Sequence, residues 1–337
     1  MMFTDFLNRL RSLSIQKILN IALVQISYIL SILLRKPMVW GKPFFIGLEP
    51  TAVCNLACPQ CPTGTGHVKR TDDFLDLDTY KDIVDDTVGT TTILSLYNQG
   101  EPLLHNSFVD MVKYASDRKV YTVTSTNGQL LSEEVCGKLV EAGLDRIIIS
   151  LDGTDRESYQ KYRIGGDFEK VKAGIRLLSE ARGTTRKPFI IIQFLVFKHN
   201  EEKVSEIRKF GKELGADRVM IKSAQIEYPE SIHEWMPVHR KHRRYRKDSS
   251  GKWMLKGKLR NRCRRLWYTT VVTTDGLIVP CCFDKLAQYP LGTLGEGSIG
   301  EIWKNRDYND FRERVLRDRE GIGICTNCTE GLGRIYR

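Results

Sequence analysis

The chain has 337 residues, of which 28% are charged, and a net charge of +11 at pH 7. This length is sufficient for two domains. Nine cysteines in so long a chain, an odd number, argue against a disulfide-rich secreted protein. Eight of them lie in or near ligand-like motifs, and Cys136 alone stands in an apparent core helix. We therefore expect a reducing, cytoplasmic location.

The positive charge is concentrated in two segments. Residues 239–265 carry thirteen Lys or Arg against one acid, and the first 46 residues carry six against Asp5. Such a run is either a solvated linker or a binding face, and both readings stay open. No recognisable DNA- or RNA-binding module accompanies the run, so nucleic acid is not predicted as a partner.

The N-terminus, residues 1–43, predicts an amphipathic helix. Residues 18–34 are mostly apolar, and polar positions 9, 16, 20, 27 and 31 step by seven and four, which places them on one narrow stripe. The apolar run is borderline for a spanning helix, and Arg35-Lys36-Pro37 replaces a signal cleavage site. Residues 1–37 either lie at the inner face of a membrane as a peripheral contact or pack on protein.

Apolar strand-like runs alternate with amphipathic helical stretches along residues 44–235. Six such units predict a parallel sheet with helices outside, folded as a partial (βα)6 TIM-like barrel. In this α/β architecture the chemistry lies at the carboxyl ends of the strands. The predicted strands are Phe44–Leu48, Thr92–Leu96, Val120–Thr124, Arg146–Leu151, Phe189–Phe197 and Arg218–Ile221.

Three thiols follow the first predicted strand within eight residues, as Cys54-x3-Cys58-x2-Cys61. A [4Fe–4S] cube normally takes four Cys ligands, so three would leave one iron open to bind a ligand. Structural zinc is the alternative, but it wants four ligands in pairs, and a Cys58–Cys61 pair would leave Cys54 unexplained.

This motif resembles that of the radical S-adenosylmethionine (SAM) superfamily. The resemblance implies that Cys54, Cys58 and Cys61 hold a [4Fe–4S] cluster whose open iron binds SAM, and that an external one-electron donor such as flavodoxin or ferredoxin reduces it. The residue before the third Cys is usually aromatic in this superfamily, and here it is Gln60.

Further motifs of the superfamily follow successive strands in order. Residues 98–102, after the second strand, are similar to its GGEP motif, with Gln in place of the first Gly. Short polar residues follow the third and fourth strands, and Arg163 resembles the residue that pairs the SAM carboxylate. The resemblance thus implies SAM contacts from Gln60, Gln99, Gly100, Glu101, Pro102, Ser125, Asn127, Ser150, Asp152 and Arg163.

A second cysteine constellation occupies residues 263–337, beyond a basic linker at 236–262. Residues 270–280 predict a β-hairpin with Asp-Gly at its turn, which brings Cys281 towards Cys263. The spacing resembles the auxiliary-cluster domain of SPASM and twitch radical SAM enzymes. It implies one fully ligated [4Fe–4S] cluster on Cys263, Cys281, Cys325 and Cys328. Cys282 is an alternative to Cys281, and zinc remains the other reading.

Over residues 45–332 the chain is therefore similar to radical SAM enzymes that oxidise or cross-link a small molecule or a peptide. No catalytic residue is identified; Lys222, at the sixth strand end, is a candidate proton acceptor or a solvated lysine. Two alternatives remain. One is a non-catalytic iron–sulfur or zinc protein that binds nucleic acid, and the other is a sulfatase maturase, whose relatives carry seven Cys in this extension where five remain here.

Overall fold

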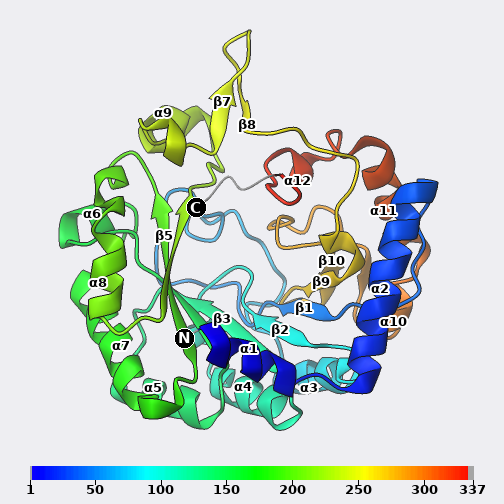
Figure 1. The fold of residues 1–337 in the computed structure, drawn as a ribbon, viewed down its shortest axis with the longest axis horizontal. Helices are drawn as coiled ribbons and strands as arrows, with labels where there is room; N and C mark the ends of the chain where they lie inside the picture. The colour runs from blue at the N-terminus through cyan, green and yellow to red at the C-terminus, as the bar shows by residue number, and fades with distance from the viewer. Residues whose placement is uncertain (1, 333–337) are drawn as a thin grey trace.

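The computed structural model describes the backbone of residues 2–332 and the side chains of residues 5–332. Six parallel strands form a curved sheet whose outer side is covered by helices (Figure 1). This is the predicted partial barrel, and its fold class is confirmed. The strands are β1 (Phe45–Leu48), β2 (Ile93–Leu96), β3 (Tyr121–Thr126), β4 (Arg146–Ser150), β5 (Phe189–Val196) and β6 (Arg218–Ser223).

The barrel helices turn apolar stripes towards the sheet. In α7, for example, Phe168, Val171, Ile175 and Leu178 are buried at helical spacing. Aspartate or serine side chains cap several of these helices, as Asp167 does for α7 by accepting from two backbone N–H groups. The helices are α3 (Leu77–Thr87), α4 (Phe108–Asp117), α5 (Glu133–Glu141), α6 (Arg156–Gln160), α7 (Phe168–Ala181), α8 (Ile207–Glu213) and α9 (Ile232–Trp235).

Strands β3 and β6 run two residues further than the apolar pattern predicted. Ser125 and Thr126 still pair with Ile148 and Ile149 of β4, although their side chains are polar. Hydrophobicity marks only the buried part of a strand, whereas backbone pairing continues to the mouth of the barrel. The polar strand ends are therefore part of the sheet and hold the motifs rigidly.

The predicted hairpin is formed by β9 (Thr269–Val272) and β10 (Leu277–Val279), with Gly276 at a positive φ of 78° in the turn. It also extends the barrel, which the sequence did not predict. Strand β9 pairs in parallel with β1, so a single sheet runs β11-β10-β9-β1-β2-β3-β4-β5-β6. Strand β11 (Gly292–Thr293) ends it, and helices α10 (Ile299–Ile302), α11 (Arg306–Asp318) and α12 (Gly323–Thr326) follow.

The basic segment between barrel and hairpin is folded. It contains an antiparallel pair, β7 (Tyr245–Lys247) and β8 (Trp253–Leu255), that projects from the molecule at the top of Figure 1. Lys and Arg side chains of this segment line a cavity of about 840 Å³ beside α9. Short 3₁₀ turns lie at Pro102–Leu104, Gly183–Thr185, Glu201–Val204, Pro229–Ser231, Arg240–His242 and Arg265–Trp267. The domain boundaries stay predictions.

The N-terminal segment forms two helices, α1 (Met2–Arg11) and α2 (Ile15–Leu34). Helix α2 lies along one edge of the molecule beside α10 and α11 (Figure 1). Ser14 caps its start, and Arg35, in the left-handed region, ends it. Within the described residues, α2 alone is long and apolar enough to cross a membrane by length and composition.

Candidate active site

The first three thiols lie in one loop directly after β1. Cys58 is buried, and the Cys61 N–H donates to the Cys58 carbonyl at 3.1 Å, which closes a tight turn. A Cβ on Gly64 would come within 2.6 Å of the Cys58 backbone nitrogen, so only glycine fits there. The loop thus holds Cys54, Cys58 and Cys61 at the carboxyl end of the barrel sheet, as predicted for a cluster site.

The surroundings of these thiols favour a bound, positively charged group. Burial raises the pKa of Cys54 to about 11 and raises the pKa of Cys58, which the charge of Arg163 opposes. A buried thiolate therefore needs a cationic partner, and iron supplies one. Polar donors already face the sulfurs: Arg163 approaches Cys58 Sγ at 3.8 Å, and Asn127 Nδ2 approaches Cys54 Sγ at 3.9 Å.

The motif after β2 is joined to this loop through its backbone. Gly100 has a φ of 71°, and a Cβ there would lie 2.2 Å from the Thr51 carbonyl oxygen. The Glu101 N–H donates to the Val53 carbonyl at 2.8 Å, immediately before the first thiol. Glycine at position 100 is therefore required for the motif to approach the cysteine loop.

The Glu101 carboxylate is buried and accepts bonds from the end of β3. Thr126 Oγ1 donates to it at 2.6 Å and the Asn127 N–H at 2.7 Å. Burial raises its pKa, which these hydrogen bonds oppose. Glu101 thereby fixes Asn127 over the cysteine loop; its predicted contact with SAM stays a prediction.

Asp152 and Arg163 form a buried ion pair beside Cys58. The Asp152 carboxylate is fully buried, accepts from Arg163 Nε at 2.7 Å, and also accepts from the Leu195 N–H at 2.6 Å. Asp152 therefore orients the guanidinium, a role that the sequence analysis did not assign to it. Predicted SAM contacts from both residues stay predictions.

Both polar atoms of the Gln60 side chain form hydrogen bonds with other residues of the protein. Its Nε2 donates to Ser231 Oγ at 2.7 Å, and its Oε1 accepts from the Glu227 N–H at 2.9 Å. The amide thus ties the cysteine loop to the segment after β6. Ser125 and Ser150 lie at the ends of β3 and β4, as expected, and contact of these residues and Gln60 with SAM is not tested.

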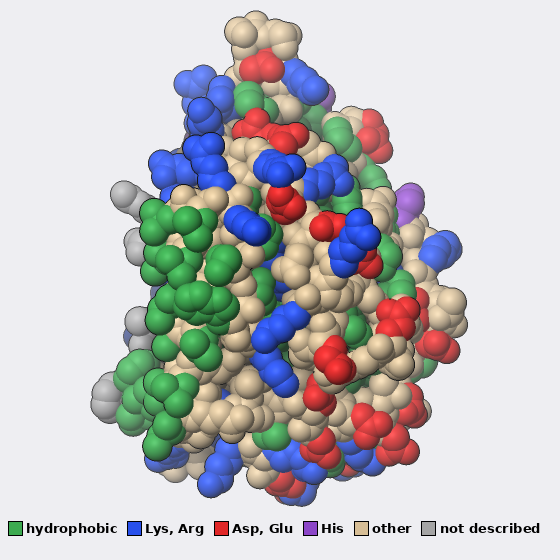
Figure 2. All heavy atoms as spheres, turned by 90° about the vertical axis from the view of Figure 1, so that its right-hand side faces the viewer, with side chains coloured by type: hydrophobic (Ala, Val, Ile, Leu, Met, Phe, Trp, Pro, Cys, Tyr) green, Lys and Arg blue, Asp and Glu red, His purple; other side chains and the backbone are tan. Residues whose placement is uncertain are grey.

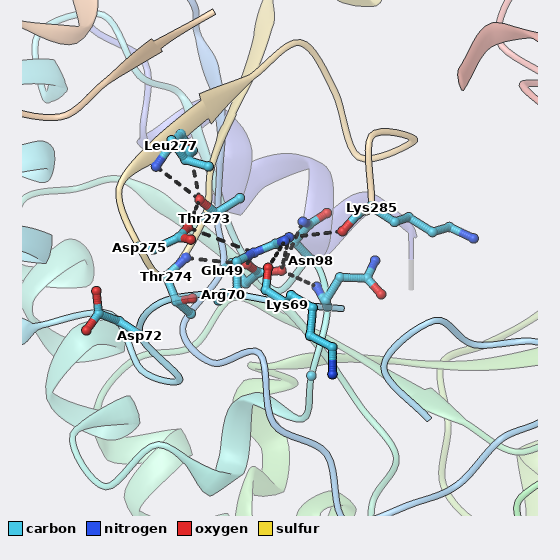
Figure 3. A network of polar contacts seen from close by, with 12 residues as sticks. Glu49, Lys69, Arg70, Asp72, Asn98, Thr273, Thr274, Asp275, Leu277 and Lys285 are labelled. Carbon is cyan, nitrogen blue, oxygen red and sulfur yellow. Dashed lines mark hydrogen bonds and ion pairs between the residues drawn. The ribbon is translucent and has the colours of Figure 1, made fainter. Parts of the chain in front are cut away.

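A polar network links the two halves of the molecule (Figure 3). The buried Glu49, just after β1, pairs with Arg70 at 2.8 Å and accepts from the Gln99 N–H at 3.1 Å. The Thr274 N–H in the β9–β10 turn also donates to Glu49, and Arg70 reaches the Lys285 carbonyl at 3.0 Å. One ion pair therefore connects the cysteine loop, the motif after β2 and the C-terminal hairpin.

The C-terminal thiols lie within electrostatic reach of one another, although among the described residues no three Cys, His, Asp or Glu side chains are arranged as a metal site. Cys325 and Cys328 are buried, and Cys281 is close enough to Cys263 and Cys328 for their charges to raise its pKa beyond the effect of burial. Burial raises the pKa of Cys328 to about 11, and Cys263 adds to the rise. Four thiols are the number that a fully ligated [4Fe–4S] cluster takes, and their role as its ligands stays a prediction. Cys282 is exposed, yet its charge also reaches Cys328, so the choice between Cys281 and Cys282 stays a prediction.

Two arginines that sequence reasoning missed flank this second site. Arg319 is buried and donates to Cys328 Sγ at 3.5 Å and to the Arg262 carbonyl at 2.8 Å. Arg265 approaches Cys282 Sγ at 3.8 Å and pairs with Glu330. Arg265 is part of the basic run at residues 239–265, and Arg319 has no sequence signal.

Tyr97 and Lys222 lie within electrostatic reach of Cys282, next to the second cysteine site. Burial lowers the pKa of Lys222, partly opposed by the charge of Cys282, and burial raises the pKa of Tyr97, with Cys282 adding to the rise. Both residues are half-buried at the ends of β2 and β6. The candidate proton acceptor is therefore not a freely solvated lysine, and Tyr97 is a neighbour that the sequence did not indicate.

Family models match two parts of the chain. Residues 48–211 match the radical SAM superfamily, and residues 263–329 match SPASM, an iron–sulfur cluster-binding domain. These ranges contain both cysteine sites and every strand-end motif described above.

Several known proteins are similar to this chain in sequence or in fold. The AdoMet-dependent heme synthase of Methanosarcina barkeri is 34% identical over 52% of this chain and 49% of its own length, so the chain spans about half of that relative. A cofactor-modifying protein for tungsten-containing aldehyde ferredoxin oxidoreductase, from Pyrococcus furiosus, is 25% identical over 85% and 87%. SuiB of Streptococcus suis bound to S-adenosylmethionine superposes with a TM-score of 0.63 at 15% identity, over 88% and 74% of the two chains.

Proposed function

Because the chain belongs to the radical SAM superfamily, in the group that carries a SPASM iron–sulfur domain, we propose that it uses SAM to oxidise or cross-link a peptide or small molecule. The observation that supports this proposal is the hairpin of the second thiol site, whose strand β9 pairs with β1, the strand that the first thiol loop follows. A [4Fe–4S] cluster fits each thiol set, and SAM fits the first.

The first cluster, when bound, supplies the electron that cleaves SAM to methionine and a 5′-deoxyadenosyl radical, which takes hydrogen from a substrate C–H bond. The chain holds the three ligands in one loop and fixes that loop through Gly100 and Glu101. Arg163, oriented by Asp152, presents a guanidinium suited to the SAM carboxylate.

Lys222 is our candidate for the group that accepts a proton from the substrate. A two-electron oxidation that begins with hydrogen-atom removal must also lose one proton and one electron. The lowered pKa of Lys222 increases its neutral, proton-accepting fraction near neutral pH. The four thiols of the second site leave no open iron if all bind, so a cluster there suits electron acceptance better than substrate ligation.

The substrate is a peptide or a small molecule. The fold is shared with SuiB, for which a structure bound to the precursor peptide SuiA is known, whereas the sequence relatives above are a heme synthase and a cofactor-modifying protein. An external one-electron donor is required by the reaction, and flavodoxin or ferredoxin is of the right class. Contact of residues 1–37 with a membrane is a further proposal.

Three earlier alternatives lose their support. The two family models favour a catalytic iron–sulfur protein over a zinc protein or a non-catalytic nucleic-acid binder. The sulfatase-maturase reading still lacks two of the seven cysteines that it needs, since only five remain in the extension. The basic run that suggested nucleic acid is folded into the β7–β8 hairpin and its surroundings.

Anaerobic reconstitution tests the proposal directly. We expect about eight irons per chain, as two cubes of four, and reductive formation of 5′-deoxyadenosine from SAM. Adding SAM should change the electron paramagnetic resonance (EPR) spectrum of one reduced cluster and leave the other unaltered. A reconstituted protein with both clusters that binds no SAM and forms no 5′-deoxyadenosine would contradict the proposal.

A further inference from the structure

Helix α2 packs on the protein with its polar side. The buried face includes Lys17, Asn20, Ser27 and Ser31, with Val24 as its apolar member. Asn20 exchanges two hydrogen bonds with the backbone of Lys42, at 3.0 and 2.8 Å. The stripe of polar residues is thus a specific docking face for the body of the enzyme.

Ser31 is the centre of a second set of polar contacts. Its hydroxyl accepts from the Met38 N–H at 2.8 Å and from Trp267 Nε1 at 3.1 Å, and it donates to the Ser27 carbonyl. Near the other end of the helix, Lys17 Nζ donates to the Lys119 carbonyl, which follows α4, at 3.4 Å. These bonds hold α2 lengthwise along the protein.

The apolar side of α2 faces outward. Among the residues whose side chains the structure describes, ten of the sixteen exposed large hydrophobic residues lie on α1 and α2. They form the long green stripe at the left of Figure 2. A soluble surface helix has the opposite arrangement, and contiguous apolar patches of this kind mark interaction surfaces. Prominent members are Ile15, Leu19, Ile26, Ile29, Leu33 and Leu34.

Basic side chains lie at both ends of this stripe and along its edge. Arg11 precedes α2, and Arg35 and Lys36 follow it, all exposed. Arg264 Nε, from the segment beside the second thiol site, donates to Gln25 on α2 at 3.0 Å. The single acid of the first 46 residues, Asp5, is buried against Arg146 and Tyr121 and does not offset this charge.

We propose that α1 and α2 form a peripheral membrane-binding surface that lies in the plane of an anionic bilayer. The apolar stripe would enter the headgroup–acyl boundary while Arg11, Arg35 and Lys36 meet lipid phosphates. A spanning orientation would strip Asn20 and Ser31 of their partners Lys42 and Trp267 inside hydrocarbon. A second copy paired antiparallel on the stripe would bring the basic ends together, which disfavours that occupant.

Flotation of the reconstituted full-length enzyme with lipid vesicles tests this surface. We expect binding to phosphatidylcholine vesicles that contain phosphatidylglycerol, weaker binding without it, and release by high salt or alkaline carbonate. The double variant Leu19→Glu/Ile26→Glu should lower partitioning by at least about tenfold, since both side chains are exposed and enter the lipid.

A charge-matched control comes from the β7–β8 region. Val238→Glu/Met254→Glu replaces two other exposed apolar residues with the same charges and should bind vesicles as the wild type does. Iron content and the SAM-dependent EPR change, both expected unaltered in the two variants, verify folding. The proposal fails if the wild type does not float, if Leu19→Glu/Ile26→Glu floats equally well, or if carbonate extracts nothing. It also fails if light scattering shows a wild-type dimer that the same variant dissociates while neither binds vesicles.

Discussion

The first thiol site comes from one loop of eight residues, whereas the second draws its ligands from three segments between residues 263 and 328. The first has three cysteines and the second has five, so a [4Fe–4S] cluster would keep one iron open only at the first. The charged neighbours differ as well. Arg163 is held by Asp152 and aimed at one thiol, while Arg319 is buried among several. We call the first site, with three thiols, the open site, and the second the closed site. The comparison indicates that the open site is arranged to bind a ligand and the closed site to accept an electron.

We expect the largest effect from substitutions that remove the open site alone. Changing Cys54, Cys58 and Cys61 together to Ala should leave about four of about eight irons and abolish SAM cleavage. Iron analysis and chromatographic detection of 5′-deoxyadenosine measure both. Cys136→Ala, in the core helix α5, is the control and should retain both clusters. SAM cleavage by the triple variant would mean that the two sites have been assigned the wrong way round.

The second prediction concerns the closed site. Cys281→Ala should lose about four irons and leave SAM cleavage without substrate turnover intact, because the open site is untouched. Cys282→Ala is the matched neighbour and should keep the full iron content. If Cys282→Ala loses iron and Cys281→Ala does not, the two cysteines exchange roles and the hairpin register at the cluster must be revised.

The third prediction tests the guanidinium at the open site. Arg163→Lys keeps the charge but loses the planar fork, so SAM should bind about ten- to a hundredfold more weakly, the range for a lost hydrogen bond to a charged group. Isothermal titration of the reconstituted protein measures the dissociation constant. Lys161→Ala, exposed two residues away, should bind SAM normally. Unchanged affinity in Arg163→Lys would remove Arg163 from the SAM site.

The smallest expected effect is a shift in reduction potential at the closed site. Positive charge and hydrogen bonds to cluster sulfurs raise the potential. Arg319→Gln should therefore lower the midpoint potential of the second cluster by tens of millivolts, while Arg319→Lys, which keeps the charge, should shift it less. EPR-monitored redox titration resolves the two clusters. A shift confined to the first cluster would contradict the placement of Arg319.

Local patterns were the part of the molecule that could be predicted. The loop from Cys54 to Cys61 is contiguous, and the six strands carry apolar runs that ended within about two residues of the observed ends. Contacts between distant segments could not be predicted. Arg70 and Arg319 sit in stretches that read as ordinary surface charge, yet the fold buries both guanidinium groups.

Helix α2 is a second example in which contacts with distant segments could not be predicted. Its polar stripe was legible at residues 20, 27 and 31, but the sequence could not say which side faces the protein. Amphipathicity defines two faces, and only the position of partners such as Lys42 and Trp267 decides which is inward. The pairing of β9 with β1 could not be predicted for a related reason. The sequence of β9 indicates only that it forms a hairpin with β10, and it carries no sign of a second partner strand.

That pairing has a consequence for how the chain reaches its native state. Phe45 of β1 lies opposite Thr269 of β9, so one edge of the first barrel strand stays without its partner until most of the chain has been synthesised. Contacts between residues so far apart in sequence slow folding, and an unpaired strand edge invites association with other chains. A barrel fragment that stops before β9 should therefore aggregate when expressed alone, and chaperone demand during biosynthesis should fall only once the C-terminal hairpin has emerged from the ribosome.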